Sequence, residues 1–302
     1  MAARAPGMAT SLPRIAVTTG DPAGIGPEVA ALAAADPVVR AVAEPILYGP
    51  EAGGSCGAFR PGVVSAEAGR ASYDAVARAA RDALDGRIDA VATAPISKAA
   101  WARAGLRWRG HTDLLAELTG AADVRMMFYA ERLSVVLATV HVPLADVPSL
   151  LTAERLEATI ALAHGELPRF GVARPRLALA GLNPHAGEGG LIGDEEQLTF
   201  IPAVTRCRAR GVDVAGPFPA DSVFRRAAAG EFDAVVACYH DQGLVPIKLL
   251  AFGQAVNVTL GLPIVRTSVD HGTGFDIAGR GVADPSGMIG AVRLAAKLAE
   301  AR

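Results

Sequence analysis

The sequence predicts an α/β protein built around a largely parallel sheet, and three observations support this. Short β-rich runs alternate with alanine-rich helical stretches from one end of the 302-residue chain to the other. Hydrophobic residues make up 51% of the chain and charged residues 20%, a balance typical of a protein with a large core. No fixed-period repeat or low-complexity linker interrupts the alternation, which therefore indicates consecutive βα units.

The expected strands are short apolar runs that end at glycine, proline or polar residues. The first, RIAVTTG at 14–20, leads into a glycine-rich loop, and IDAVATAP follows at 88–95. Further strands are expected at 125–130, 133–142, 176–183, 232–240 and 255–261.

The expected helices follow these strands and begin with recognisable start signals. Pro27 stands in the first turn of one helix, where its missing N–H would have no partner in any case. Thr152 can cap another, and apolar residues at 156, 160, 163 and 167 then keep helical spacing. The glycine- and proline-rich stretch 49–62 is expected to be a surface loop. The expected helices span 27–35, 66–85, 152–170, 194–210, 221–229 and 285–301.

Charge and hydropathy exclude several classes of function. A net charge of −2 with interspersed signs gives no electrostatic reason to bind nucleic acid or an anionic membrane. No apolar run reaches the roughly 20 residues of a membrane span. Residues 1–13 are expected to be a tail without a signal peptide, and Met8 is a candidate start. Cys56, Cys207 and Cys238 are scattered, which favours a reducing cytoplasm.

Three histidines close expected strands: His141, His185 and His240. Ligands of open α/β sheets bind beyond the carboxyl ends of strands, so one sheet could direct all three rings to one crevice. Three imidazoles without thiolates suit a divalent ion such as Zn²⁺ with open positions for substrate. Their separations are too long for a local motif, and satisfaction of loop carbonyls is the alternative for each ring.

Two acids lie near these histidines. Asp241 follows His240 directly, and Asp221 precedes an expected helix. Either carboxylate could orient a ligand ring or take a proton. For Asp221, capping the helix is an equally good interpretation.

A second candidate cluster is cationic. Lys248 follows the apolar LVPI, and an ammonium, an amide and a guanidinium together suit a phosphate monoester. The cluster consists of Lys248, Asn257 and Arg266, with His111 and Thr112 upstream.

Two glycine-rich loops, TGDPAGIGPE at 19–28 and DHGTGFDIAGRGVADP at 270–285, are candidates for nucleotide binding through backbone amides. Neither matches the G-x-G-x-x-G dinucleotide fingerprint, and the first lacks the lysine of a P-loop.

Five segments together carry a resemblance to a known family: TTGDPAGIGPEV, GHTD, GLNPHAGEGG, YHDQGLVPIK and DHGTGFDIAGRGVADP. In this order, over roughly residues 14–297, the chain resembles the 4-hydroxythreonine-4-phosphate dehydrogenases of the pyridoxine pathway. The resemblance implies an isocitrate/isopropylmalate dehydrogenase-like fold, in which two α/β domains flank a cleft and NAD(P) binds without a Rossmann fingerprint. The implied domains are a cofactor-side domain, 8–110 plus 262–302, and a substrate, metal and dimerisation domain, 111–261.

Carried over position by position, the resemblance assigns roles to both clusters. It implies a homodimer with the active site at the subunit interface, NAD or NADP as cofactor, and a divalent metal, Zn²⁺ first and Mg²⁺ or Co²⁺ as alternatives. Asp241, Asp221 and Lys248 are the candidates for proton transfer. The implied metal ligands are His141, His185 and His240, the substrate-binding residues His111, Thr112, Lys248, Asn257 and Arg266, and the cofactor-binding residues His271, Gly272 and Asp276.

The implied reaction is metal-dependent, NAD(P)-linked oxidation of 4-phosphooxy-L-threonine to 2-amino-3-oxo-4-(phosphonooxy)butanoate, which decarboxylates to 3-amino-2-oxopropyl phosphate. Asp113 stands where the family more often has Glu, and Gly274 where it more often has Ala, which bears on substrate detail. One alternative is a dehydrogenase of a related phosphorylated sugar acid, 4-phospho-threonate or 4-phospho-erythronate. The other is a non-catalytic module that binds metal or phosphate.

Overall fold

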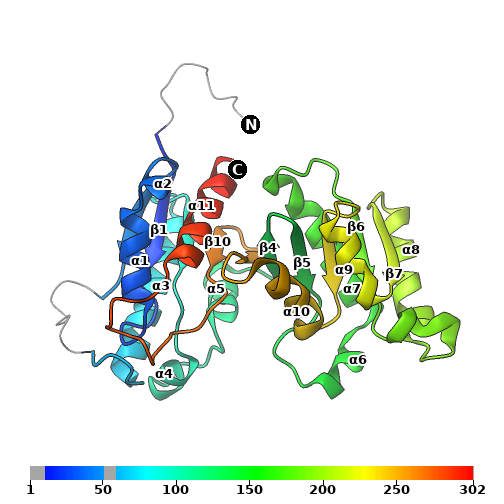
Figure 1. Ribbon diagram of the computed structural model, residues 1–302, viewed down its shortest axis with the longest axis horizontal. Coiled ribbons are helices and arrows are strands. Elements are labelled where there is room, and N and C mark those ends of the chain that lie inside the picture. Colours follow the sequence, from blue (N-terminus) through cyan, green and yellow to red (C-terminus); the bar gives the residue numbers. More distant parts are fainter. Residues whose placement is uncertain (1–10, 51–58, 302) are drawn as a thin grey trace.

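A computed structural model describes residues 11–50 and 59–301 of the protein (Figure 1). Most of the expected tail, including Met8, together with Cys56 and most of the expected loop 49–62, lies outside the described residues. Ten strands form one sheet in the order β2-β1-β3-β10-β9-β4-β5-β8-β6-β7. The strands are β1 (Arg14–Thr18), β2 (Glu44–Tyr48), β3 (Ala90–Thr93), β4 (Arg125–Ala130), β5 (Leu133–Leu137), β6 (Leu177–Ala180), β7 (Val214–Phe218), β8 (Ala234–Ala237), β9 (Val256–Leu260) and β10 (Val265–Ser268).

The sheet consists of two parallel groups joined by antiparallel strands. One group is β2-β1-β3-β10 and the other is β5-β8-β6-β7, and every neighbouring pair within each group is parallel. Between the groups, β10 with β9, β9 with β4, and β4 with β5 are antiparallel. The predicted α/β class with a largely parallel sheet is therefore confirmed. The domain boundaries inferred from the sequence stay a prediction.

Helices cover both faces of the sheet (Figure 1). Most follow a strand, and short 3-10 turns and one π-helical turn extend or connect them. The helices are α1 (Gly26–Ala35), α2 (Pro37–Arg40), α3 (Ala66–Leu84), α4 (Lys98–Arg103), α5 (His111–Thr119), α6 (Val147–Leu150), α7 (Ala153–Glu166), α8 (Ile201–Ala209), α9 (Ala220–Ala228), α10 (His240–Ala251) and α11 (Ser286–Glu300), with 3-10 turns η1 (Leu144–Asp146), η2 (Leu167–Phe170) and η3 (Pro184–Gly190) and the π-helical turn η4 (Glu196–Phe200).

Alternating side chains of the strands supply separate cores on the two faces. On β1, Ile15 and Val17 join the core under α1 and α11, whereas Ala16 joins the core under α3, α4 and α5. On β8, Val236 faces α7 and α8, whereas Val235 faces α9 and α10. Because both faces are covered, the strands read as continuous apolar runs in the sequence.

The seven expected strands are all present, six with shorter bounds and 125–130 with the expected ones, and the six expected helices match within a few residues. Thr152 caps α7 as predicted, accepting a hydrogen bond from the Arg155 amide at 3.2 Å. Three strands, β2, β7 and β10, were not predicted. The strand expected to end at His240 ends at Ala237, and His240 instead begins α10, a helix that the sequence did not predict.

Among the described segments, no helix combines the length and the apolar composition that crossing a membrane requires.

Candidate active site

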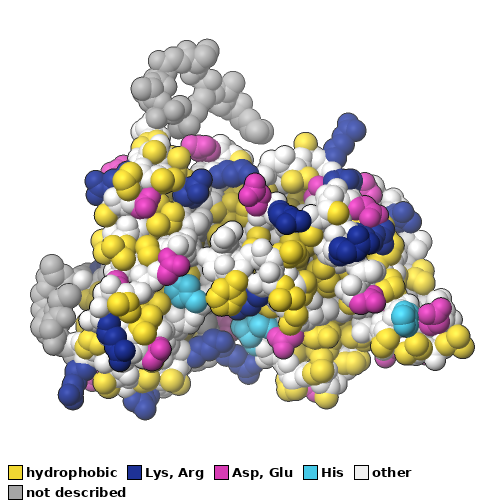
Figure 2. All heavy atoms as spheres, in the orientation of Figure 1, with side chains coloured by type: hydrophobic (Ala, Val, Ile, Leu, Met, Phe, Trp, Pro, Cys, Tyr) yellow, Lys and Arg dark blue, Asp and Glu magenta, His cyan; other side chains and the backbone are white. Residues whose placement is uncertain are grey.

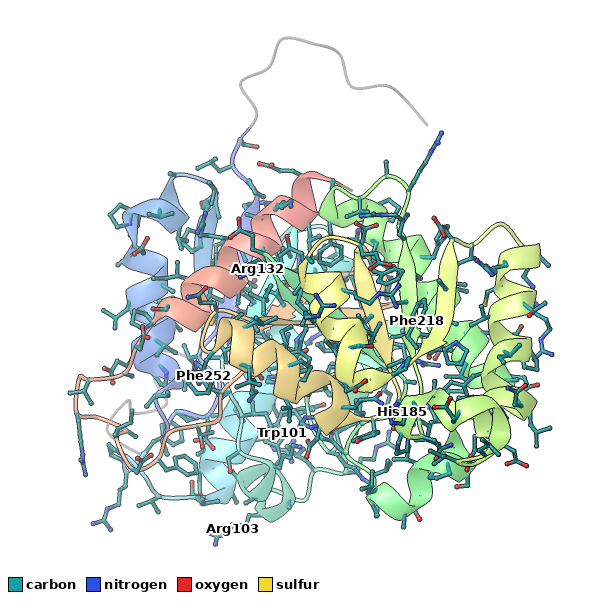
Figure 3. All side chains as sticks on the ribbon, turned by 45° about the vertical axis from the view of Figure 1, so that its right-hand side comes forward. Trp101, Arg103, Arg132, His185, Phe218 and Phe252 are labelled. Carbon is teal, nitrogen blue, oxygen red and sulfur yellow. The ribbon has the colours of Figure 1, made fainter. Side chains whose placement is uncertain are left out.

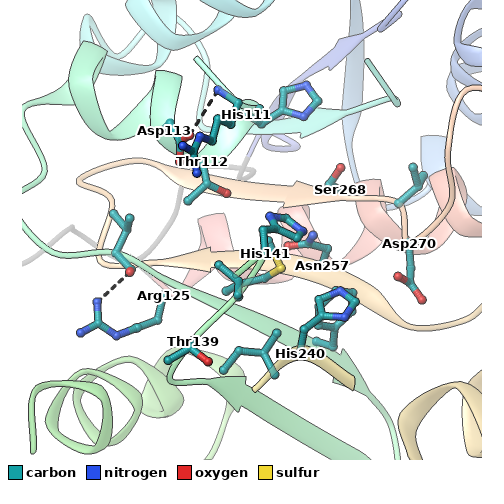
Figure 4. A pocket seen from close by; sticks show the side chains of 18 of the residues that line it. His111, Thr112, Asp113, Arg125, Thr139, His141, His240, Asn257, Ser268 and Asp270 are labelled. Carbon is teal, nitrogen blue, oxygen red and sulfur yellow. Dashed lines mark hydrogen bonds between the residues drawn. The ribbon is translucent and has the colours of Figure 1, made fainter. Parts of the chain in front are cut away.

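A cleft of about 770 Å³ lies where the two strand groups meet (Figure 4). Its walls come from the segment after β3, the start of α5, the loop after β5, the start of α10, and strands β9 and β10. These elements place side chains far apart in the chain around one space. All five predicted substrate-binding residues line the cleft: His111, Thr112, Lys248, Asn257 and Arg266.

Arg266 is the most buried charge in this cleft, with an exposed fraction of 3%. It lies on β10, and its guanidinium donates to the Thr93 hydroxyl at 2.8 and 3.2 Å and to the Thr259 hydroxyl at 3.0 Å. Among residues 11–50 and 59–301, no carboxylate pairs with it. Burial lowers the pKa of Arg266 to about 9, so the group stays charged at neutral pH. A buried cation held only by hydroxyls has strong affinity for an anion.

Two neutral polar atoms beside Arg266 lack partners. His111 begins α5, where its ring packs edge-on against Trp101 at a centroid distance of 6.0 Å. Its Nε2 atom and the Oδ1 atom of Asn257 are buried and have no hydrogen-bond partner within the described part of the chain. Burial and then the charge of Arg266 hold the pKa of His111 well below its usual value, so the ring is neutral. An unpartnered buried polar atom costs about 1–3 kcal/mol, a cost that a bound ligand removes.

Lys248 lies on α10 at the opposite wall. Its ammonium is 3.5 Å from the carboxylate of Asp270, which follows β10 and also lines the cleft. Burial raises the pKa of Asp270, and the nearby Lys248 opposes that rise. This pair therefore places a carboxylate with a raised pKa in the same cleft as Arg266.

His141 and His240 form a pair at one side of the cleft (Figure 4). Their ring centroids are 5.6 Å apart, and Asp241 lies 2.7 Å from Nδ1 of His240. A carboxylate on one ring nitrogen fixes the tautomer and leaves the other nitrogen free for a metal, as in many metalloproteins. The pKa of His141 is lowered, first by partial burial of the ring and then by the nearby Lys98 and His240 side chains. The pair fits two positions of a divalent metal site.

His185 does not join this pair within the chain. It follows β6, which neighbours β8 in the sheet, so the strand order satisfies the predicted arrangement. However, His185 is exposed on its loop and does not line the cleft (Figure 3). Across the described ranges, no group of three histidine, cysteine or acidic residues is placed to hold a metal ion. One chain therefore brings two of the three predicted ligands together.

Comparison with known proteins identifies the family. The profile of the family described as Pyridoxal phosphate biosynthetic protein PdxA matches residues 30–295. A 4-hydroxythreonine-4-phosphate dehydrogenase of Geobacter metallireducens is 44% identical over 98% of each chain. The chain belongs to the PdxA family. A D-threonate 4-phosphate dehydrogenase of Cupriavidus necator is 42% identical over 98% of this chain and 100% of its own.

Solved structures agree with this membership. The 4-hydroxythreonine-4-phosphate dehydrogenase of Klebsiella pneumoniae is 40% identical and superposes with a TM-score of 0.86 over 97% of this chain and 99% of its own. The isocitrate dehydrogenase of Methylococcus capsulatus, at 18% identity and a TM-score of 0.50, covers 92% of this chain and 83% of its own. The second likeness concerns the fold alone and confirms the predicted isocitrate dehydrogenase-like architecture.

In this PdxA-family chain the two glycine-rich loops touch. The Ile25 amide donates to the Thr273 carbonyl at 2.8 Å, and a Cβ at Gly24 would lie 2.7 Å from that carbonyl oxygen. Of the predicted cofactor-binding residues, His271 and Gly272 line the cleft, whereas Asp276 is exposed outside it.

Two predicted acids also lie outside the PdxA-family cleft. Asp221 and Asp241 line a groove of about 760 Å³ between α9 and α10. Asp221 is the second residue of α9, whose N-terminus has no side-chain cap, so the capping interpretation is wrong. Asp241 contacts His240, which lines the cleft.

The cleft contains charged residues that the sequence interpretation missed. Lys98 and Arg109 line it, as does Arg125, which donates to the Thr159 hydroxyl at 2.8 Å and pairs with Asp123. Lys98 follows the predicted strand 88–95, so the rule about strand ends would have found it. Asp270 begins the segment DHGTGFDIAGRGVADP, but the sequence interpretation treated that segment as a glycine-rich loop and gave Asp270 no role.

Proposed function

We propose that this protein is a metal-dependent, NAD(P)-linked dehydrogenase that oxidises 4-phosphooxy-L-threonine to 2-amino-3-oxo-4-(phosphonooxy)butanoate, which decarboxylates to 3-amino-2-oxopropyl phosphate. The single observation that carries the proposal is the buried guanidinium of Arg266, which faces the cleft without a carboxylate partner among the described residues. The names of the relatives from Geobacter and Klebsiella support the same reaction.

The phosphate end of the substrate would lie against Arg266. The guanidinium donates charge-assisted hydrogen bonds to phosphate oxygens, and neutral His111 adds a donor or acceptor at its buried Nε2. Thr112 and Asn257 complete the pocket, and Lys248 supplies a second cation from α10. Fixing the phosphate in this way orients the hydroxyl to be oxidised.

The metal would be held by His141 and His240, with Asp241 fixing the orientation of the second ring. Zn²⁺ is the first choice for imidazole ligands, with Mg²⁺ or Co²⁺ as alternatives. When bound, the metal supplies Lewis-acid chemistry and nicotinamide supplies a hydride acceptor, for which His271, Gly272 and Asp276 are the proposed site. Asp241 and Asp221 remain candidate bases, but the Lys248–Asp270 pair is better placed to accept the substrate proton.

A homodimer would complete the metal site, with His185 of the partner subunit as the third ligand. Exposed apolar side chains on α10 and close to His185 support this proposal. Leu249 on α10 is 82% exposed, and Leu191, six residues after His185, is 86% exposed. Apolar side chains gather on the face that carries α10 (Figure 2). Exposed apolar surface of this kind marks protein–protein interfaces.

A related phosphorylated sugar acid, such as D-threonate 4-phosphate, is the second candidate substrate. A curated relative with that name is 42% identical, almost as similar as the 4-hydroxythreonine-4-phosphate dehydrogenase at 44%. The two substrates share the phosphate end and differ in an amino or hydroxyl group.

Parallel assays would decide between these functions. The purified protein with Zn²⁺ is given each substrate with NAD and with NADP, and cofactor reduction is followed by absorbance. A higher kcat/KM with 4-phosphooxy-L-threonine supports the main proposal, and a higher value with D-threonate 4-phosphate supports the second. No reduction with either substrate would leave a non-catalytic module that binds metal or phosphate.

The cytoplasm is the proposed location, supported by two buried free thiols, Cys207 and Cys238.

A further inference from the structure

Glu196 is a buried carboxylate outside the cleft. It begins η4, between the His185 loop and α8, and its exposed fraction is 1%. Its Oε1 atom accepts from the amides of Leu182 and Asn183, both at 2.8 Å, and its Oε2 atom accepts from Nδ2 of Asn183 at 2.9 Å. Within the described ranges, no lysine or arginine pairs with it. Three N–H donors from one loop therefore compensate its buried charge.

The loop that donates these hydrogen bonds has a strained backbone. His185, Ala186 and Glu188 have φ values of 56°, 53° and 45°, in the left-handed region that non-glycine residues rarely adopt. Such backbone conformations are strained in non-glycine residues and persist only where the surroundings impose them. The strain therefore needs a nearby structural cause.

The carboxylate of Glu196 lies directly against this strained loop. A Cβ at Gly187 would lie 2.8 Å from its Oε2 atom, so the strained turn passes directly over the carboxylate. The Ala186 amide donates to the Asn183 carbonyl at 3.0 Å, which links the backbone on both sides of His185 to the residue that Glu196 binds twice. The imidazole of His185 is exposed on the outside of this turn.

We propose that Glu196 is a positioning residue that holds the 182–188 loop in its strained form and thereby presents His185 as a preorganised metal ligand. The π-helical turn at Glu196–Phe200 supports this role, because π-helical turns are frequent at functional sites. The inference rests on the proposed function, in which His185 binds the metal. Without the carboxylate, the loop relaxes and His185 is no longer held in place. Metal binding must then order the imidazole, and this ordering weakens the affinity for the metal.

The test measures Zn²⁺ affinity of the full-length protein by competition with a chromophoric chelator. Glu196→Ala should bind Zn²⁺ about 10- to 100-fold more weakly, the range seen when a residue that orients a ligand is removed. Glu196→Gln should lose less, because its amide oxygen still accepts from the Leu182 and Asn183 amides. Hydrogen exchange of those two amides should be faster in both variants, with or without metal.

Glu157→Gln is the matched control. Glu157 is also a buried glutamate, on α7, and it pairs with Arg206 at 2.6 Å and Arg210 at 3.1 Å. This variant should lower the unfolding temperature and leave Zn²⁺ affinity at the wild-type value. Equal losses of affinity in Glu157→Gln and Glu196→Ala would indicate general instability and overturn the positioning role.

His185→Ala separates the two levels of the proposal. If it weakens Zn²⁺ binding while both Glu196 variants match the wild type, the positioning role of Glu196 is wrong and the ligand assignment stands. If His185→Ala itself leaves Zn²⁺ affinity unchanged, the ligand assignment is wrong and the role of Glu196 falls with it. Should Glu196→Ala not fold, Glu196→Gln decides by the same criteria.

Discussion

The wall of the cleft around Arg266 and the loop around His185 both carry predicted ligand-binding residues, but they are built in opposite ways. Arg266 is 3% exposed and rests on regular strands, where hydroxyl groups of two neighbouring strands fix its fork. His185 is exposed on an irregular turn that a buried carboxylate holds. The first region gathers polar groups of one chain around a shared cleft, whereas the second presents a single imidazole outside that cleft.

This difference teaches which part of a site one chain can complete. A buried cation and two unpartnered polar atoms are costly, so they persist where a ligand removes that cost. An exposed imidazole is hydrated, so it destabilises the folded chain little even without a partner. In the proposed function, the anion-binding wall is therefore complete within one subunit, and the metal site depends on assembly of two subunits.

The largest effect is expected from His185→Ala. Loss of a metal ligand should lower both Zn²⁺ content and turnover, by about 10³-fold or more for turnover. His141→Ala should be equally inactive. Mixing the two inactive variants under conditions of subunit exchange should restore about a quarter of wild-type activity, because half of the dimers are mixed and each holds one intact site. No recovery on mixing would mean that the ligands do not come from two subunits.

The second largest effect is expected from Arg266→Met. This variant should lower kcat/KM about 10²- to 10³-fold, since losing a buried charge that binds an anion costs about 2–5 kcal/mol. The free energy of unfolding without substrate should stay the same or increase, because the uncompensated cation is removed. Arg266→Lys keeps the charge but not the planar fork, and should recover only part of the loss. Substrate saturation at wild-type concentrations in Arg266→Met would contradict an anion-binding role.

Asp241→Ala should weaken Zn²⁺ binding about tenfold, the lower end of the range for a residue that orients a ligand, because the 2.7 Å contact with His240 is exposed. Saturating metal should restore most of the turnover. Asp146→Ala removes another exposed carboxylate five residues after His141 and serves as the control. Activity that Zn²⁺ cannot rescue in Asp241→Ala would indicate a direct role in proton transfer.

The smallest effect concerns the pH dependence of stability. Because the pKa of His111 lies well below the unfolded value of 6.5, only the unfolded state binds a proton as the pH falls through 6.5. The free energy of unfolding should therefore fall by up to about 1.4 kcal/mol for each pH unit below 6.5. Urea unfolding between about pH 7 and pH 5.5 should show a shallower loss in His111→Gln. Equal slopes in both proteins would mean that His111 is protonated in the folded state.

Much of the fold could be predicted because its signals are local. The apolar runs of the central strands and the cap at Thr152 depend on neighbours in sequence. β7 was not predicted because Gly216 and Pro217 interrupt its apolar pattern. β10 was not predicted because it has only four residues and one of them is the charged Arg266. α10 was not predicted because Gly243 and Pro246 interrupt its helical pattern.

The site was predictable as a set of residues but not as an arrangement. Motifs found the anion-binding residues, and the order of strands β5, β8 and β6 places the three histidines after neighbouring parallel strands, as the rule for α/β sheets predicts. No local signal shows that Arg266 lacks a carboxylate partner or that His185 turns outward. The first depends on the burial of Arg266 among distant strands. The second depends on the backbone angles of the loop that contacts Glu196 in η4.

The position of β10 in the sheet has a consequence for biosynthesis. It pairs with β3 through Val265 and Ala90, and Ala283 donates to the Glu28 carboxylate at 3.0 Å. A ribosome makes β1, β2 and β3 long before β10, so the nascent chain carries an open sheet edge at β3 until β10 emerges. The wall that carries Arg266 thus forms only after β10 has been made, when β10 joins strands that were made much earlier.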